Sequence, residues 1–543
     1  MLEKLEQMNT QTRVLIATVL SLLVFIAYDY FFMPKPSHLK EANATAAVQR
    51  EAQAQPGSAA APAASSAAAA PAASQPKGAG SAPVTGTVGN DLSRVVATVE
   101  TSNATIEFDA LGRISQVYLK DKQYRNEEGA ELKLFNSPKI PKPLEIRFSD
   151  PALNALAFKT PYTVSASHVV IDGNEAKTLT FTQNLDGFEV RKIVTIYPDH
   201  HYDVKVEMSE TKPWFISPGY RPDIRIDNYT VHGVMIEEAD GTLTIIDDGD
   251  AKGTEAFRKA RIAVAFDRYY ATAFYDFEKG MDVVVNKDAE ENPILFVKGD
   301  TAERTLHGYI GPKEYKILHH IHPELTKIIE FGWFTFIAAP MFKVLLWLHD
   351  YIPNWGWAIV VLTLLIRLIL YPLTYKGMVS MHRLKQLQPK IKELQAKYKG
   401  DPQKLNMHMM ELYKKHKANP LGGCLPMLLQ IPVFFAIYRV LLNAIELKGA
   451  PWILWIQDLS VMDPYYVLPV LMGASMWLHQ RLTPSNFTDP MQEKIFKWLP
   501  VVFTFFFVTF PAGLVLYWLT NNVASILQQL MINRMLEKQP KAE

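Results

Sequence analysis

An arginine lies inside a long apolar run of this 543-residue chain. The run extends from Trp355 to Pro372, is long enough to cross a membrane as a helix, and contains Arg367 as its one charged residue. A guanidinium does not give up its charge, and placing it in hydrocarbon costs at least about 2.5–3.5 kcal/mol. Arg367 therefore requires a partner, a water-filled cavity or a polar cargo.

The sequence offers Arg367 few ion-pair partners. Asp29 lies at the outer end of the first apolar segment, and the other spans predicted below contain no Asp or Glu. An arginine without an acidic partner indicates a hydrated cavity, although snorkelling or a structural pair remains an alternative. Thr363 lies one turn away on the same helix face and is predicted to line this cavity, unless its hydroxyl bonds its own backbone.

The first 90 residues divide into two segments. Residues 1–33 are predicted to form a cytoplasmic tail and a transmembrane anchor, because the apolar stretch at 14–33 is longer than that of a cleaved signal sequence. Cleavage remains the alternative. Residues 34–90 are rich in Ala, Pro, Ser, Gln and Gly. This composition cannot bury enough apolar surface to offset the entropy of ordering, so a disordered linker is predicted.

Residues 91–318 change to the two-residue period typical of strands. Thr178–Gln183 alternates, Asp186-Gly187 supplies a turn, and Tyr202–Met208 alternates again. Many short strands separated by Asp, Gly, Asn and Pro predict an antiparallel β-sandwich on the periplasmic side. Its carboxylates and histidines follow no catalytic spacing, so we expect a plain soluble domain.

The remainder of the chain is directed to the membrane. Residues 319–350 are predicted to contain an interfacial amphipathic helix, because charged residues flank and interrupt a short apolar stretch. Residues 351–543 are predicted to form a helical core. With the anchor, its five spans make six crossings and leave both termini in the cytoplasm. The five spans are predicted at 355–375, 421–442, 465–482, 496–510 and 513–531.

A strongly basic loop at 378–417 separates the first two core spans. Lys and Arg outnumber acidic residues in it, which predicts a cytoplasmic location. Apolar residues recur every three or four positions from Met381, and Gly400-Asp401-Pro402 combines a helix stop, an N-cap and a first helical position. The loop is therefore predicted to be a cytoplasmic helical hairpin.

Composition and motifs argue against several classes of function. The formal net charge is +1, so sequence-specific nucleic-acid binding is not predicted. Cys424 is the single cysteine, the adjacent His319 and His320 point in different directions, and the chain has no Gly-rich nucleotide-binding motif. No cofactor, metal site or enzyme activity is predicted.

Several core motifs resemble those of one family. Asn419–Phe434, Tyr371–Thr374 and Phe510–Tyr517 are similar to signature segments of the YidC membrane protein insertase family. The order of anchor, large periplasmic sandwich and five-helix core resembles its Gram-negative form. The resemblance implies a multi-pass protein of the bacterial inner membrane that inserts and folds membrane proteins, alone or beside the Sec translocon.

The resemblance also implies roles for individual residues. Arg367 matches an arginine in a hydrophilic groove that opens to the cytoplasm and lipid, and Thr363 lies beside it. An apolar face along which an incoming helix slides into lipid maps to Ile431, Phe434 and Tyr517. The ring of Tyr517 is expected to face lipid while its hydroxyl faces the groove.

The implied partners follow from the same resemblance. They are nascent membrane proteins, the Sec translocon with its accessory proteins, and membrane lipids, while the basic hairpin would contact the ribosome and targeting factors.

Two other functions stay open. A transporter would use Arg367 to bind a small anion, although the halves show no inverted repeat. A carbohydrate enzyme at 91–318 would need only one membrane anchor, and the five further spans are more than an anchor requires.

Overall fold

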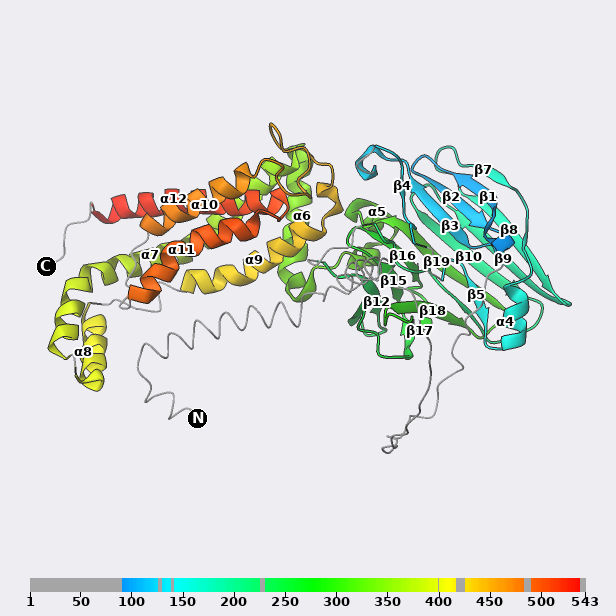
Figure 1. The fold of residues 1–543 in the computed structure, drawn as a ribbon, viewed down its shortest axis with the longest axis horizontal. Coiled ribbons are helices and arrows are strands. Elements are labelled where there is room, and N and C mark those ends of the chain that lie inside the picture. The colour runs from blue at the N-terminus through cyan, green and yellow to red at the C-terminus, as the bar shows by residue number, and fades with distance from the viewer. Residues whose placement is uncertain are drawn as a thin grey trace, which may run out of the picture. The chain divides into compact units, whose positions relative to one another are not determined.

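The computed structural model describes residues 90–125, 129–137, 141–224, 230–398, 400–416, 425–482 and 490–537. The predicted anchor at 14–33 and almost all of the predicted linker lie outside these residues. The chain divides into two compact units between Ile328 and Ile329 (Figure 1). One unit is β-rich and the other is helical.

The β-rich unit contains three sheets. A nine-stranded sheet has the order β13 (Leu243–Asp247), β12 (Gly233–Glu237), β15 (Ile262–Phe266), β16 (Tyr270–Tyr275), β19 (Glu303–Pro312), β10 (His201–Met208), β9 (Phe188–Ile196), β8 (Lys177–Leu185) and β6 (Thr163–Val164). One five-stranded sheet has the order β4 (Leu132–Lys133), β3 (Ile114–Leu119), β2 (Ala104–Asp109), β1 (Val95–Glu100) and β7 (His168–Val170). The other has the order β14 (Glu255–Ala260), β17 (Met281–Lys287), β18 (Pro293–Gly299), β11 (Trp214–Ile216) and β5 (Ile146–Phe148).

Short helices complete this unit. They are α4 (Pro151–Ala157), α5 (Tyr315–Ile321) and the 3-10 turns η1 (Asn90–Ser93), η2 (Lys122–Tyr124) and η3 (Pro323–Ile328). Lys327 in η3 donates to Glu237 in β12 at 2.6 Å. Residues 319–328, which were predicted to belong to the interfacial segment, therefore pack with the β-rich unit.

The alternating segments of the sequence form strands at the predicted places. β8 and β9 pair in antiparallel register across the Asp186-Gly187 turn, where both residues have positive φ, 53° and 95°. Positive φ at both central residues is what a tight type I′ hairpin turn requires. A β-rich domain is thus confirmed, with one departure from an all-antiparallel arrangement: β1 pairs with β7 in parallel.

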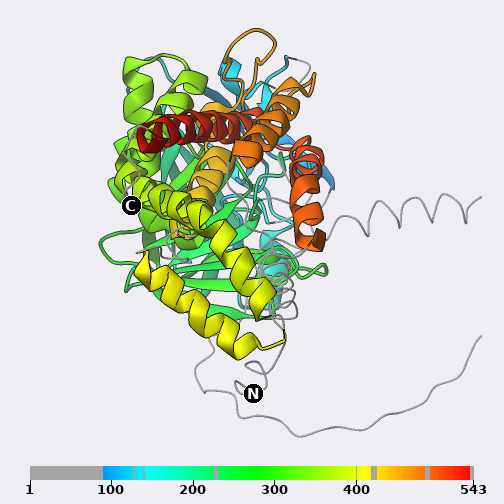
Figure 2. The same cartoon turned by 90° about the vertical axis from the view of Figure 1, so that its left-hand side faces the viewer.

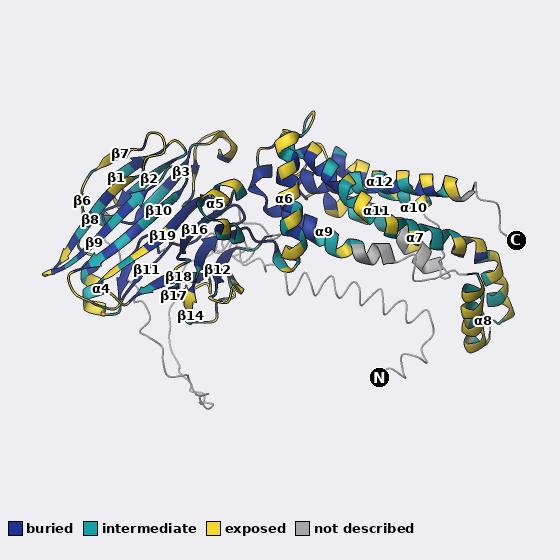
Figure 3. Ribbon diagram, turned by 180° about the vertical axis from the view of Figure 1, so that it is seen from behind, coloured by how far each residue is buried: buried dark blue, intermediate teal, exposed yellow. Residues whose placement is uncertain are grey.

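Some strands show no alternation of apolar and polar residues, so the sequence pattern does not reveal them. Every residue of β11, β12 and β16 is buried, so both faces of these strands are covered (Figure 3). A strand covered on both faces becomes an apolar run without a polar side, and its period disappears.

The helical unit is built from seven helices and two 3-10 turns in its described residues. They are η4 (Gly332–Phe334), α6 (Thr335–Tyr351), α7 (Trp355–Lys397), α8 (Pro402–Lys415), α9 (Leu425–Asn443), η6 (Ile445–Leu447), α10 (Val467–Leu482), α11 (Pro490–Phe507) and α12 (Ala512–Glu537). α12 packs against both α7 and α10, while α9 packs against α6. Gly473 of α10 allows α11 to approach closely, because a Cβ there would lie 1.8 Å from the Thr504 hydroxyl.

The first core span and the first arm of the hairpin form one helix. α7 continues without a break through residues 376–378, where a boundary between the span and the hairpin was predicted. Asp401 caps α8 by accepting from the Lys404 amide at 3.1 Å, and Pro402 takes the first helical position, as predicted. Leu384 and Leu387 are buried between the arms, with Leu412 packed against them. The two arms run side by side in Figure 2.

Two described helical segments are long and apolar enough to cross a membrane by length and composition. They are Gly332–Tyr351 and Trp355–Leu384. The first of these overlaps the segment that was predicted to lie at the interface. The apolar parts of α9 and α11, at Gln430–Asn443 and Lys497–Phe507, are shorter.

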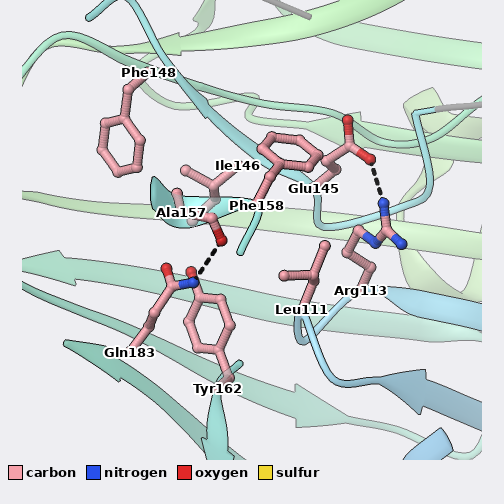
Figure 4. A pocket seen from close by; sticks show the side chains of 9 residues that line it. All are labelled: Leu111, Arg113, Glu145, Ile146, Phe148, Ala157, Phe158, Tyr162 and Gln183. Carbon is pink, nitrogen blue, oxygen red and sulfur yellow. Dashed lines mark hydrogen bonds and ion pairs between the residues drawn. The ribbon is translucent and has the colours of Figure 1, made fainter. Parts of the chain in front are cut away.

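A buried charge cluster organises the core of the β-rich unit. Arg113 donates to Asp109 at 2.7 Å, and all three side chains of Arg113, Asp109 and Glu145 are almost fully enclosed. Arg113 also donates to Glu145 at 2.8 Å (Figure 4). The neighbouring cavity has a volume of about 10 Å³, room for roughly one water molecule. The buried Lys192 donates to the carbonyls of Leu111 at 3.0 Å and Leu144 at 3.2 Å. This cluster fixes loops and leaves no space for a ligand.

Removing Arg113 takes the ion-pair partner from the buried Asp109, whereas Glu145 keeps Arg147 at 2.7 Å. We expect Arg113→Met to lower the free energy of unfolding of the β-rich unit by about 3–5 kcal/mol. Chemical denaturation of the full chain in detergent, followed by fluorescence, measures this change. The matched control is Arg191→Met, because Arg191 pairs with Glu189 on the surface and is expected to contribute less than about 1 kcal/mol. Equal losses in both variants would contradict a stabilising role that is specific to the buried cluster.

Candidate functional site

Arg367 lies on α7 and faces α12. Its Nε donates to Asn521 Oδ1 at 2.8 Å, and its Nη2 donates to the Asn521 carbonyl at 3.0 Å and to the Ser525 hydroxyl. Its Nη1 lies 3.4 Å from Gln528 Oε1. Residues spaced by four and three positions share one helix face, so α12 presents a polar stripe to the guanidinium.

Every acceptor around Arg367 is neutral. No carboxylate lies within ion-pair distance of it among the described residues. The guanidinium is partly buried. Its N–H groups donate to these neutral acceptors, but no neighbouring negative charge cancels its positive charge. The hydrogen bonds compensate desolvation, and the positive charge remains available to a negatively charged group.

A small cavity lies beside this cluster. Its volume is about 20 Å³, which accommodates roughly one water molecule. Polar groups of Arg367, Tyr517, Asn521, Gln430 and Thr374 line it, together with apolar side chains of α7 and α9. In this conformation the cavity is too small for a polypeptide segment.

Thr363 does not line this cavity. Its side chain is 1% exposed, and its hydroxyl donates to the Ile359 carbonyl at 2.7 Å. Of the two expectations for Thr363, the structure shows the one in which its hydroxyl bonds the backbone of its own helix.

The three predicted slide residues differ in exposure. Ile431 is 45% exposed, and Phe434 is half-buried with its ring 4.6 Å from that of Trp518. Tyr517 is only 3% exposed and lies beside Arg367. The expectation that its ring faces lipid is therefore wrong for this conformation, because α7 and α9 side chains enclose it.

The polar stripe on α12 was missed in the sequence. Asn521, Ser525 and Gln528 recur at helical spacing within the last apolar span, which is the signal that would have found them. Polar residues at this spacing inside a span indicate a buried hydrogen-bonding face.

A second arginine inside a predicted span was also missed. Arg439 on α9 is 8% exposed, and its Nη1 lies 3.5 Å from a carboxylate oxygen of Glu330. Asn443 donates to the Glu330 carbonyl at 2.7 Å. Arg439 thus has the acidic partner that Arg367 lacks, which ties the segment preceding α6 to α9. The chemistry of the two arginines differs for this reason.

Long apolar helices with arginines inside them are typical of a membrane protein, here with a helical core and a β-rich domain. Comparison with protein families gives two matches. Residues 96–344 match the YidC periplasmic domain, and residues 347–539 match the 60Kd inner membrane protein family.

Curated relatives align over nearly the whole chain. The membrane protein insertase YidC of Campylobacter jejuni is 51% identical over 97% of this chain and 97% of the relative. Those of Wolinella succinogenes and Helicobacter pylori (strain 26695) are 52% and 45% identical, over 100% and 99% of this chain and 98% of each relative. The chain belongs to the YidC membrane protein insertase family. It is an inner-membrane protein with a periplasmic β-rich domain, and its substrates are nascent membrane proteins.

A solved structure described as an active YidC insertase with its first transmembrane domain resolved also matches. It covers 80% of this chain and 95% of its own chain at 20% identity, with a TM-score of 0.36. The family assignment stands on the curated relatives.

Arg367 and Asn521 should be energetically coupled. In a double-mutant cycle of Arg367→Leu and Asn521→Leu, we expect a coupling energy of about 1.5–3 kcal/mol, because the bond joins a charged donor to a half-buried amide. Unfolding of the full chain in detergent measures it. The control pairs Arg367→Leu with Asn522→Leu, since Asn522 instead donates to Ser475 at 3.1 Å. Coupling of similar size in the control cycle would refute a specific bond.

Proposed function

We propose that the chain inserts membrane proteins by receiving a polar segment of the substrate at Arg367. The observation that carries this proposal is a permanent charge on α7 that, among the described residues, is held by neutral acceptors alone, on the face of α12 that carries Asn521 and Ser525. Such a site binds an incoming carboxylate without first breaking an internal ion pair. A carboxylate adds ion-pair attraction and bidentate geometry to the hydrogen bonds that the guanidinium already makes with neutral acceptors, so an acidic segment displaces the acceptors of α12.

The proposed site must open before it accepts a substrate. The cavity of about 20 Å³ supports a resting state in which α7 and α12 are closed upon each other. Exchange of neutral acceptors for substrate groups would separate these helices on the cytoplasmic side. This opening creates the hydrophilic groove proposed for the family, in which Arg367 and the backbone near Thr363 form the wall.

The apolar helix of the substrate would follow a separate path. Ile431 and Phe434 lie one turn apart on α9, and their exposed faces support a route into lipid. Tyr517 would join this route when the groove opens. Burial of an apolar helix at about 25 cal/mol per Å² drives the step, and acidic segments gain about 2.3 kcal/mol per charge for each 100 mV of membrane potential.

The proposed topology has six crossings and cytoplasmic termini. The anchor (1–33) leads through the linker (34–90) to the periplasmic domain (91–318), and α6 lies at the outer interface before the core (351–543). Exposed Lys343 and Trp347 on one face of α6 support the interfacial placement.

The proposed cytoplasmic partners bind the hairpin formed by residues 378–417. Its exposed surface carries basic residues from both arms, which favours the ribosome and acidic patches of targeting factors. These exposed basic residues are Arg383, Lys390, Lys392, Lys397, Lys404, Lys414 and Lys415. Sec proteins and membrane lipids are proposed to contact the exposed apolar faces of the core.

Replacing Arg367 tests the proposed site. Arg367→Ala should reduce insertion of substrates with acidic outer segments at least about tenfold, because the charge that receives them is lost. Arg367→Lys should restore only part of the rate, since a lysine keeps the charge but not the fork that reaches Asn521 and Ser525. Reconstituted insertion into liposomes measures both rates.

Two controls accompany this test. Arg481→Ala removes an exposed arginine at the end of α10 and should leave insertion unchanged. A substrate with a neutral outer segment should depend less on Arg367. Insertion of acidic substrates at the wild-type rate by Arg367→Ala would disprove the proposal, whereas uptake of small anions by the wild type would favour a transporter.

Photo-crosslinking tests the proposed path. Probes at 431 and 434 should capture a stalled nascent membrane protein, because these positions are accessible in the closed state. A probe at 517 should capture it only when α7 and α12 separate, so a disulfide joining these helices should abolish that crosslink alone. Phe505 on α11 is 84% exposed and serves as the lipid-facing control. Equal capture at 505 and 431 would argue against a defined path.

A further inference from the structure

A large cleft lies in the β-rich unit. Its volume is about 440 Å³, within the range of small-molecule sites and far above the two cavities already described. Segments of β10, β16 and β19 and the end of α5 line it. They supply Asp199, His201 and Asp203 of the β9–β10 turn and β10, residues 275–278 at and after the end of β16, His307 of β19, and residues 320–322.

The cleft carries an excess of negative charge. Asp199, Asp203, Asp276 and Glu278 line it, and none of the described lining residues is Lys or Arg. Arg304 reaches Asp276 from behind at 3.0 Å and balances one carboxylate. Glu278 is exposed at the rim. A cleft lined by one sign of charge concentrates ligands of the opposite sign.

Imidazoles hold two of the carboxylates in position. Asp199 is bonded to His201, and Asp203 accepts from Tyr197 at 3.0 Å and lies 2.6 Å from His307 Nδ1. The hydrogen bond with Asp203 raises the pKa of His307. Burial acts to raise the pKa of Asp203, but the hydrogen bonds with His307 and Tyr197 and the nearby charges of His307 and His201 together outweigh it, so the pKa of Asp203 is lowered. Both pairs stay fixed at the wall of the cleft.

Aromatic rings form the remaining wall. The ring of Tyr275 stacks on His307 with centroids 5.5 Å apart, and that of Phe277 stacks on His322 at 4.0 Å. Arg261 lies 5.3 Å from the centre of the Phe277 ring, which shows that this wall already accepts a cation. Aromatic walls beside carboxylates recognise amines and guanidinium groups on apolar chains.

The geometry argues against a metal ion as the ligand. Among the described residues, no group of three or more His, Cys, Asp or Glu side chains is placed to hold one. The imidazoles bond carboxylates or stack on rings, and they do not converge on one point. An organic cation needs no such convergence, because its charges are spread along a chain.

We propose that this cleft binds an organic polycation, a flexible chain bearing ammonium groups, and releases it as the pH falls. The source is either a free polyamine or a lysine-rich peptide segment, which share this chemistry. The carboxylates receive the ammonium groups, and Tyr275 and Phe277 contact the methylene chain between them.

The pH dependence follows from His307, which lines the cleft 2.6 Å from Asp203. The hydrogen bond with Asp203 raises the pKa of His307, so this imidazole gains its positive charge as the pH falls through that raised pKa, and it then cancels the charge of Asp203. The excess of negative charge is therefore largest above the pKa of His307.

Calorimetry on the full chain in detergent tests the proposal. The probes are spermidine and tri-lysine, with glucose and tri-glycine as uncharged controls. We expect spermidine or tri-lysine to bind at about pH 8 and to bind at least about tenfold more weakly at about pH 5.5. Preference for tri-lysine identifies a peptide site, and preference for spermidine identifies a polyamine site.

Matched variants locate the binding. Glu278→Gln at the exposed rim should weaken binding several-fold without affecting folding, and Asp203→Asn should weaken it further. Glu210→Gln removes an exposed carboxylate that pairs with Lys212 outside the cleft, and it should bind as the wild type does. Failure of both cations to bind, preferential binding of glucose, or unchanged binding by Glu278→Gln and Asp203→Asn would overturn the proposal.

Discussion

The helical unit depends on one constraint, which is a guanidinium that cannot lose its charge within an apolar helix. Arg367 needs hydrogen-bond acceptors at fixed positions, and α12 supplies them from Asn521 and Ser525. This requirement sets which face of α12 meets α7. The next residue, Asn522, then points to α10 and donates to Ser475. The polar contacts of a single arginine thereby orient three helices that apolar packing alone would leave free to rotate.

The neutrality of those acceptors matters as much as their number. The pair of Arg439 and Glu330 shows what this chain does where a buried arginine only has to be stabilised, since each charge cancels the other. Breaking such a pair leaves an uncompensated charge, which opposes any opening. The neutral acceptors of Arg367 supply hydrogen bonds but no opposite charge, so a carboxylate, which supplies both, would be the stronger partner. One arginine is therefore suited to fasten α9, and the other to exchange partners.

The sequence predicted those features that depend on local chemistry. The Asp186-Gly187 turn, the Asp401 cap and the alternating strands were predictable because each rests on neighbouring residues. Arg367 stood out because its own segment is apolar. The partners of Arg367 could not be assigned in the same way, since α12 lies more than 150 residues further along and which of its faces meets α7 is decided by packing. The enclosure of Tyr517 depends on the same packing, and apolar residues on both faces concealed β11, β12 and β16.

The two units differ in where they place large apolar side chains. The β-rich unit buries Trp214 and Phe215 completely, whereas the helical unit exposes Phe505 and Ile369 on its outer surface. A protein folded in water is stabilised by the first arrangement, and a protein folded in lipid tolerates the second, because lipid tails solvate such side chains. Charged groups follow the reverse pattern. In the β-rich unit, enclosed charges such as Arg113 and Asp109 fix the fold, and the carboxylates that remain accessible line a cleft. In the helical unit, Asn521 and Ser525 of α12 solvate the charge of Arg367 in place of water, so the charge has a stable position, and a polar group of the proposed substrate would displace these acceptors rather than the arginine.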